Sequence, residues 1–167
     1  MTVRTAAEAD LPRVAEIKVH NWADTYAPLL DPSVLGSFLD EAAQLDYLGE
    51  KLRRPSTLFL VAEDGSGAVV GFALTYVDEQ PDPWLESLHV IRESRGAGAG
   101  TRLMRATAAH LLACGRRTMR LGVIQGNGAA GRFYEHLGGT MTGREPASWA
   151  DGVWHEIYRW DDISSLA

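Results

Sequence analysis

The sequence predicts a mixed α/β fold in which helices flank a central β-sheet. Two observations support this prediction. The first third of the chain repeats apolar residues at helical spacing, and the chain beyond residue 57 alternates strand patterns with helix patterns. With 167 residues, 46% of them hydrophobic, and no repeat or linker, the chain is long enough for one domain with a sizeable core. We therefore expect a single domain over residues 1–167.

The first third is predicted to be mostly helical after a short strand at residues 3–5. Asp10 is a candidate N-cap, and Pro12 follows in the first turn, where its missing N–H costs little. Asp31-Pro32 repeats this start signal. The apolar positions at helical spacing in the three predicted helices are Leu11, Val14, Ile17, Val34, Leu35, Phe38, Leu39, Leu45, Leu48 and Leu52.

The rest of the chain is predicted to alternate strands and helices. The turn signal Asp64-Gly65-Ser66-Gly67 joins strands at 57–62 and 68–77 into a hairpin, and two prolines in 78–83 then interrupt the sheet. The glycines at 115 and 138–139 end two helices. The remaining predicted elements are strands at 84–90, 119–123, 140–142 and 153–160, and helices at 100–113 and 127–137.

Charge and composition exclude several function classes. The net charge of −6 argues against nucleic-acid binding through a broad basic surface and mildly favours cationic substrates. The single cysteine, Cys114, excludes an internal disulfide, and its helical context predicts a buried or half-buried side chain. The sequence has no apolar run typical of a signal peptide or a membrane span. We expect a cytoplasmic protein that binds neither nucleic acid nor membrane.

The most informative motif is a glycine-rich turn between a predicted strand and a predicted helix. The strand at 84–90 is followed by Arg95-Gly96-Ala97-Gly98-Ala99-Gly100-Thr101. Such a turn presents backbone N–H groups at a helix N-terminus, where a phosphate binds well. Its spacing does not match a dinucleotide fingerprint, and it lacks the lysine of a P-loop. A tight turn without a ligand is the alternative interpretation, and the turn alone does not decide between the two.

A second motif lies one predicted strand further along the chain: Asn127-x-x-Ala130-x-x-Phe133-Tyr134-x-x-Leu137-Gly138. Together with Arg95-x-x-Gly98-x-Gly100 and the strand Leu88-His89-Val90, it resembles the paired motifs of the GNAT superfamily of N-acetyltransferases. The resemblance covers roughly residues 3–160. It implies a GNAT-like α/β (α+β) fold with a mixed, mostly antiparallel sheet of about six to seven strands and helices on both faces.

Two departures from the family pattern concern packing. Gly139 stands where the family usually has an aromatic residue after Leu-Gly. The link from strand to turn, Ile91-Arg92-Glu93-Ser94, lacks the proline that is often found there.

The resemblance implies an enzyme that transfers the acetyl group of acetyl-coenzyme A to a primary amine, by direct attack in a ternary complex and without a metal. The N–H groups of the turn are expected to bind the pyrophosphate, where a Cβ would push the backbone away. Main-chain groups of Leu88, His89 and Val90 are expected to bind the pantetheine arm, as an added strand does. The residues expected to bind the cofactor are Leu88, His89, Val90, Arg95, Gly96, Ala97, Gly98, Ala99, Gly100, Thr101, Asn127 and Tyr134.

Two residues are expected to move protons. Tyr134 stands at the position of the family's general acid, which protonates the departing thiolate. Glu86 is the leading candidate for the base, since period-two alternation would place it on the sheet face of Leu88, with His89 on the other face. An amine that arrives deprotonated needs no base. The alternative bases, on the last predicted strand, are His155 and Glu156.

The acceptor is predicted to be the amine of a small molecule. A protein or peptide N-terminus is one alternative, and a non-catalytic sensor of acetyl-coenzyme A is another. The pocket walls are expected from residues 23–39, 78–84 and 144–153. The predicted strand at 153–160 is a candidate for pairing between two copies in a homodimer. Aromatic residues that could form a substrate box, although loop anchoring is favoured, are Trp22, Tyr26, Trp84, Trp149 and Trp154.

Overall fold

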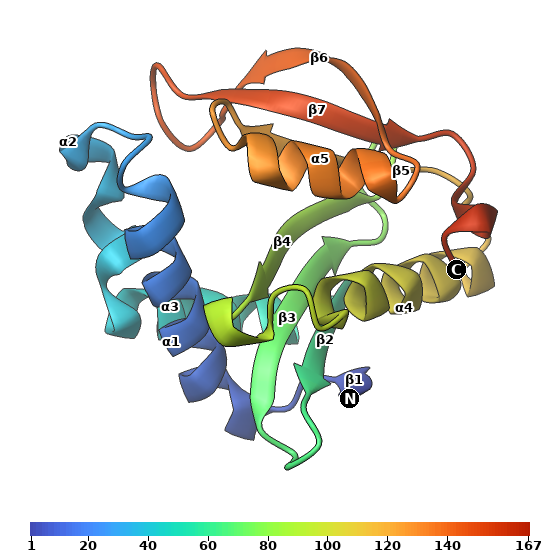
Figure 1. The fold of residues 1–167 in the computed structure, drawn as a ribbon, viewed down its shortest axis with the longest axis horizontal. Coiled ribbons are helices and arrows are strands. Elements are labelled where there is room, and N and C mark those ends of the chain that lie inside the picture. The colour runs from blue at the N-terminus through green and yellow to red at the C-terminus, as the bar shows by residue number, and fades with distance from the viewer.

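The computed structural model describes residues 1–167 and contains one seven-stranded sheet in the order β1-β2-β3-β4-β5-β7-β6 (Figure 1). Neighbouring strands are antiparallel, except that β4 and β5 are parallel. The mixed, mostly antiparallel sheet expected from the sequence is confirmed. The strands are β1 (Thr2–Thr5), β2 (Thr57–Glu63), β3 (Val69–Tyr76), β4 (Trp84–Val90), β5 (Met119–Ile124), β6 (Thr140–Pro146) and β7 (Trp154–Trp160).

Helices cover both faces of the sheet, as Figure 1 shows. Helices α1 (Leu11–Asn21) and α3 (Glu41–Arg53) pack on one face, where α1 contacts β3 and β4. Helix α4 (Ala99–Ala113) packs on the other face, and α5 (Gly128–His136) lies against β6 and β7. A π-helical turn at Trp22–Tyr26 extends α1, and α2 (Pro32–Leu35) is a single short turn. None of these helices combines the length and the apolar character needed to cross a bilayer.

The starts of α2 and α3 follow local capping chemistry, whereas the start of α1 does not. The carboxylates of Asp31 and Asp40 accept hydrogen bonds from backbone N–H groups at the starts of α2 and α3. The prediction that Asp10 caps α1 is wrong. Its carboxylate instead binds the guanidinium of Arg4 on β1 at 2.8 and 2.9 Å, and it accepts the Ala7 N–H. This ion pair fixes β1 to the start of α1.

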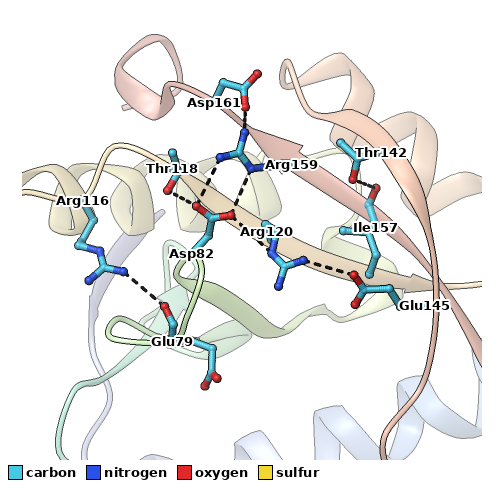
Figure 2. A network of polar contacts seen from close by, with 10 residues as sticks. All are labelled: Glu79, Asp82, Arg116, Thr118, Arg120, Thr142, Glu145, Ile157, Arg159 and Asp161. Atoms are coloured by element: carbon cyan, nitrogen blue, oxygen red, sulfur yellow. Dashed lines mark hydrogen bonds and ion pairs between the residues drawn. The ribbon is translucent and has the colours of Figure 1, made fainter.

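The parallel strands β4 and β5 pair at only two positions, Trp84 with Arg120 and Leu85 with Leu121. Beyond Leu85 the two strands diverge. Buried Asp82 holds the closed end together: its carboxylate accepts hydrogen bonds from Thr118 at 2.6 Å and from Arg159 at 3.1 Å (Figure 2). Arg120 approaches the same carboxylate at 3.6 Å. One side chain therefore joins the loop before β4 to β5 and β7.

A β-bulge interrupts the pairing of β3 with β4. Leu74 pairs with Ser87 and Thr75 with Leu85, so that Glu86 is an extra residue on β4. The bulge shifts the alternation of faces by one residue. Leu85 and Leu88 pack on the side of α4, whereas Glu86 contacts Tyr47 of α3 and His89 contacts α1. The prediction that Glu86 shares a face with Leu88 and opposes His89 is therefore wrong.

Two further predictions differ from the structure. Cys114 is exposed, because α4 ends there and Gly115, at φ +75°, turns the chain away. Strand β7 lies between β5 and β6, so its backbone is paired on both sides and offers no edge to a second copy. The outer strand at this end of the sheet is β6, which extends to Pro146 rather than ending at residue 142.

Two glycines permit close packing around α5. A Cβ at Gly100 would lie 3.1 Å from the Phe133 ring, so this glycine lets α4 approach α5. A Cβ at Gly139 would lie 2.7 Å from the ring of Trp160. The indole of Trp160 thus packs against the position where the family usually places an aromatic residue.

We expect replacement of Asp82 by Asn to lower the free energy of unfolding by about 2–3 kcal/mol at neutral pH, because two guanidinium groups lose their buried counter-charge. Urea denaturation measures this difference. The control is Asp161→Asn, which removes an exposed carboxylate paired with the same Arg159 and should change stability far less.

The effect of Asp82→Asn should also depend on pH. Although desolvation acts to raise it, hydrogen bonds from Thr118 and Arg159 hold the pKa of Asp82 below its ordinary value. The stabilisation is therefore complete above the unfolded pKa, about 3.9, and is lost as the pH falls through the lower folded pKa. The stability difference between wild type and variant should shrink below about pH 4. A difference that stays constant down to acid unfolding would contradict this assignment.

Candidate functional site

A cavity of about 650 Å³ lies where β4 and β5 diverge, and it extends to α1 and α3. Strand β4 lines it from Trp84 to His89, and β5 lines it from Leu121 to Ile124. The three predicted wall segments all contribute, through Tyr26, Ser37, Phe38, Trp84, Glu145, Pro146, Ser148 and Trp149. The contribution of α3 was not predicted from the sequence, because nothing local in its helical pattern marks a cavity wall. Its lining residues are Ala43, Gln44, Tyr47 and Lys51.

The glycine-rich turn leads into α4 with a row of free N–H groups. Gly96 and Gly98 have φ of +82° and +88°, which favour glycine, and a Cβ at either would meet nothing within 4 Å. Glycine is therefore needed at these two positions for its backbone conformation and not for lack of space. The N–H groups of Arg95 and Ala97 donate to carbonyls within the turn. The N–H groups without a protein acceptor are those of Gly96, Gly98, Ala99, Gly100 and Thr101.

The side chain of Arg95 holds this turn against two other elements. Its guanidinium donates to the side-chain oxygen of Asn21 on α1 at 2.9 Å and to the carbonyl of Val90 at 3.1 Å. The Asn21 amide donates to the same Val90 carbonyl at 3.2 Å. Exposed Arg95 therefore joins the turn to α1 and β4 by hydrogen bonds, and its positive charge remains near the turn.

The edge of β4 that faces β5 is unpaired from Glu86 to Val90. Main-chain groups on this edge are available to an extended ligand, as the sequence predicts for Leu88, His89 and Val90. The His89 ring is buried against Phe72, with Nδ1 lying 3.3 Å from the Asn21 amide nitrogen. Desolvation, together with nearby Lys18 and Arg95, lowers the pKa of His89 to about 3. The ring is therefore neutral at physiological pH.

Helix α5 brings Asn127 and Tyr134 to the cavity. The Asn127 side chain caps the helix, accepting the Ala130 N–H at 3.3 Å. The Tyr134 ring packs against Tyr158 and Trp160, each with a centroid 6.1 Å away. Burial raises the pKa of the Tyr134 phenol. The hydroxyl is thus protonated at neutral pH and can donate a proton.

Glu86 projects from the bulge toward α3. Its carboxylate accepts a hydrogen bond from the Trp84 indole at 2.9 Å and lies 3.5 Å from the Tyr47 hydroxyl. The side chain is reached by solvent through the cavity, yet the surrounding walls desolvate it and raise its pKa. The charges of Lys18 and Lys51 partly offset this rise. A carboxylate with a raised pKa is suited to accept a proton near neutral pH.

The two alternative bases, His155 and Glu156, lie on opposite faces of β7. His155 lines the cavity, where desolvation lowers the pKa of its ring. Glu156 does not line the cavity and lies on the opposite face of the strand, close to Tyr158. Glu156 is therefore not positioned to serve as a base in this cavity. No group of three or more His, Cys, Asp or Glu side chains could hold a metal ion.

The predicted aromatic residues both anchor loops and line the cavity. Trp22 is buried, stacks on Phe38 at 4.0 Å and meets the edge of Trp149 at 5.5 Å. These three rings join the segment after α1 to the loop before β7. Trp154 is different: it is 46% exposed and lies outside the cavity.

Comparisons with known proteins point to one family. The profile of the acetyltransferase (GNAT) family matches residues 17–139, which include both motifs and Glu86. An uncharacterised N-acetyltransferase of Mycobacterium tuberculosis is 28% identical over 134 residues, covering 80% of this chain and 85% of the relative.

Solved structures share the fold. The PaiA N-acetyltransferase of Thermoplasma acidophilum, in complex with coenzyme A, has a TM-score of 0.79 at 21% identity, over 95% of this chain and 96% of its own. A ribosomal-protein-alanine N-acetyltransferase of Brucella melitensis has a TM-score of 0.75 at 21% identity, over 96% and 99% of the two chains.

Proposed function

The chain belongs to the GNAT family of acetyltransferases, and we propose that it transfers the acetyl group of acetyl-coenzyme A to a primary amine by direct attack in a ternary complex. The observation that carries this proposal is the divergence of β4 and β5. It leaves an unpaired strand edge that lines the same cavity as Tyr134 and continues along the chain to the turn with the free N–H groups at the start of α4.

The cofactor's pyrophosphate binds at the free N–H groups of Gly96 and of Gly98 to Thr101. The dipole of α4 adds favourable potential for an anion at this end of the helix. A second cavity beside the turn is lined by Arg102 and Arg105, which place positive charge next to the nucleotide end of the cofactor. The pantetheine arm runs along the unpaired edge of β4 at Leu88, His89 and Val90, and Asn127 lines the same cavity.

The reaction takes place where the two strands separate. The amine nitrogen attacks the thioester carbonyl carbon, and a free backbone N–H of β4 stabilises the developing oxyanion. Collapse of the tetrahedral intermediate breaks the carbon–sulfur bond, and Tyr134 donates its phenolic proton to the leaving thiolate. Glu86 takes the proton that the amine must lose, directly or through a water molecule.

The size of the cavity favours a small acceptor. A volume of about 650 Å³ falls within the range typical of small-molecule sites. The Brucella relative is named as an enzyme acting on a ribosomal protein, so a peptide N-terminus is the alternative acceptor. A panel of small amines and peptides, assayed by release of free thiol, separates these two and also distinguishes both from a non-catalytic sensor.

Tyr134→Phe should lower kcat by roughly 10²-fold, because the thiolate then leaves without a positioned proton donor. The KM for acetyl-coenzyme A should change little, since the ring remains in place. Tyr158→Phe is the matched control, as this neighbouring tyrosine lies outside the cavity. Equal turnover of wild type and Tyr134→Phe at saturating cofactor would remove Tyr134 as the acid.

Glu86→Gln should remove the acidic limb of the kcat/KM profile. Only the carboxylate form accepts a proton, so the wild-type rate falls as the pH drops through the raised pKa of Glu86, and glutamine has no such ionisation. Glu145→Gln is the control, since Glu145 lines the same cavity but pairs with Arg120. If the limb persists unchanged in Glu86→Gln, the base is another group, with His155 the first candidate.

Gly98→Val should weaken acetyl-coenzyme A binding at least tenfold by calorimetry. A β-branched residue disfavours φ of +88°, so the N–H groups after it in the turn are displaced. Gly67→Val is the matched control: Gly67 has φ of +85° and equally open surroundings, but lies in the hairpin between β2 and β3. Wild-type affinity in Gly98→Val would refute the pyrophosphate site.

A further inference from the structure

The cavity gathers positive charge in a protein that is acidic overall. The chain has a net charge of −6 and only two lysines, Lys18 and Lys51, and both line the cavity together with Arg54. Two carboxylates also line it, but that of Glu145 is paired with Arg120 at 3.4 Å. Glu86 is thus the single carboxylate free to balance three cations.

Lys18 is the deepest of these cations. It is only 4% exposed, and its ammonium group makes no hydrogen bond or ion pair within the protein; Glu86 is the one carboxylate whose charge acts on it. The Lys18 ammonium lies over the face of the Tyr47 ring, 4.2 Å from the ring centroid. Desolvation lowers the pKa of Lys18 to about 8, so the group is still mainly charged at neutral pH. A charge that is this strongly desolvated and has no hydrogen-bonded partner is unfavourable, which indicates that a ligand in the cavity supplies one.

The other two cations continue the row toward the surface. The Lys51 ammonium lies 5.0 Å from the Tyr47 ring and 5.6 Å from the Tyr76 ring. The guanidinium of Arg54 lies 4.5 Å from the Tyr76 ring. Neither makes an ion pair within the protein. The row therefore runs across the faces of two tyrosine rings from a buried end to an exposed end.

The same tyrosines connect this row to Glu86. The hydroxyls of Tyr47 and Tyr76 lie 3.5 Å apart, and the Tyr47 hydroxyl is also 3.5 Å from the Glu86 carboxylate. The proposed base and two of the cations thus contact the same tyrosine, Tyr47, in one cavity. The cofactor's phosphates do not account for the cations, because no residue of the turn from Arg95 to Thr101 lines this cavity.

We propose that the acceptor carries a carboxylate as well as its amine, and that Lys18, Lys51 and Arg54 bind this carboxylate while Glu86 faces the amine. This inference rests on the proposed function, because it takes from that proposal that an amine accepts the acetyl group. It reverses the expectation from net charge, which mildly favours cationic substrates. The Tyr47 and Tyr76 hydroxyls add neutral donors beside the cations. A carboxylate suits the site better than a phosphate, because the adjacent Glu86 would repel a dianion more strongly.

The test compares acids with their matched amides. A series of ω-amino acids from glycine to 6-aminohexanoate, their primary amides and the corresponding aminoalkylphosphonates is titrated into the coenzyme A-loaded protein by calorimetry. The same acids and amides are then assayed with acetyl-coenzyme A for thiol release. The acid of best-fitting length should bind roughly ten- to a hundredfold more tightly than its amide, as expected for charge-assisted hydrogen bonds.

Variants test whether the preference for acids over amides depends on the lysines of the cavity. Lys18→Met and Lys51→Met should each reduce the preference for acid over amide at least fivefold, with affinity for the amides and for acetyl-coenzyme A retained. Lys51 is only half-buried, so its variant tests the site even where Lys18→Met fails to fold. Arg53→Met is the matched control, since Arg53 lies beside Arg54 but pairs with Glu8 outside the cavity.

The outcomes separate this inference from the proposed function. Equal affinity for acids and amides, or no binding of any acid, overturns the carboxylate subsite even where amines are acetylated. Tighter binding of the phosphonates overturns the choice of carboxylate. Preferential binding of acids that depends on Lys18 and Lys51, without thiol release, supports the subsite and refutes the transferase proposal.

Discussion

The site depends on the early separation of two parallel strands. Pairing of β4 with β5 stops after Leu85, and the cavity with its unpaired strand edge lies beyond that point. Such an edge loses backbone hydrogen bonds, so the closed end must hold the strands together. Asp82 does so by joining β5 and β7 through Arg120 and Arg159 (Figure 2). These polar contacts thus join the strands at one end, and at the other end the strands open into the cavity.

The bulge on β4 determines the chemistry of the opening. By adding one residue opposite β3, it turns Glu86 toward α1 and α3, where Trp84 and Tyr47 surround the carboxylate. A regular strand that kept Leu88 on the side of α4 would direct the same carboxylate to that side as well. The bulge therefore brings a carboxylate of raised pKa and the lysines of two helices into one cavity. Bulges are common beside functional sites for this reason.

Several groups at the site lack partners inside the protein. The N–H groups at the start of α4 have no acceptor, and the ammonium of Lys18 lies over aromatic rings without a hydrogen bond or ion pair. Neighbouring groups of the same kind are fully used: Arg95 and Asn21 bind each other and the Val90 carbonyl. For Lys18 the contrast is informative, because a folded chain normally satisfies its buried polar groups, whereas the first N–H groups of any helix lack an acceptor within the helix. Under the two proposals above, the groups without partners form two separate anion sites, one at the turn and one on the face of α1 and α3.

The sequence by itself determined the order of helices and strands, the glycine turn and the motif from Asn127 to Gly138. These depend on apolar periodicity and turn chemistry within a few residues. It did not determine the face of Glu86, the exposure of Cys114, the ion pair of Asp10 or the inner position of β7. Nor did the sequence show that Lys18, Tyr47 and Glu86 lie together in one cavity. Only the tertiary structure decided these, because strand register, burial and contacts between distant elements arise from packing rather than from local sequence.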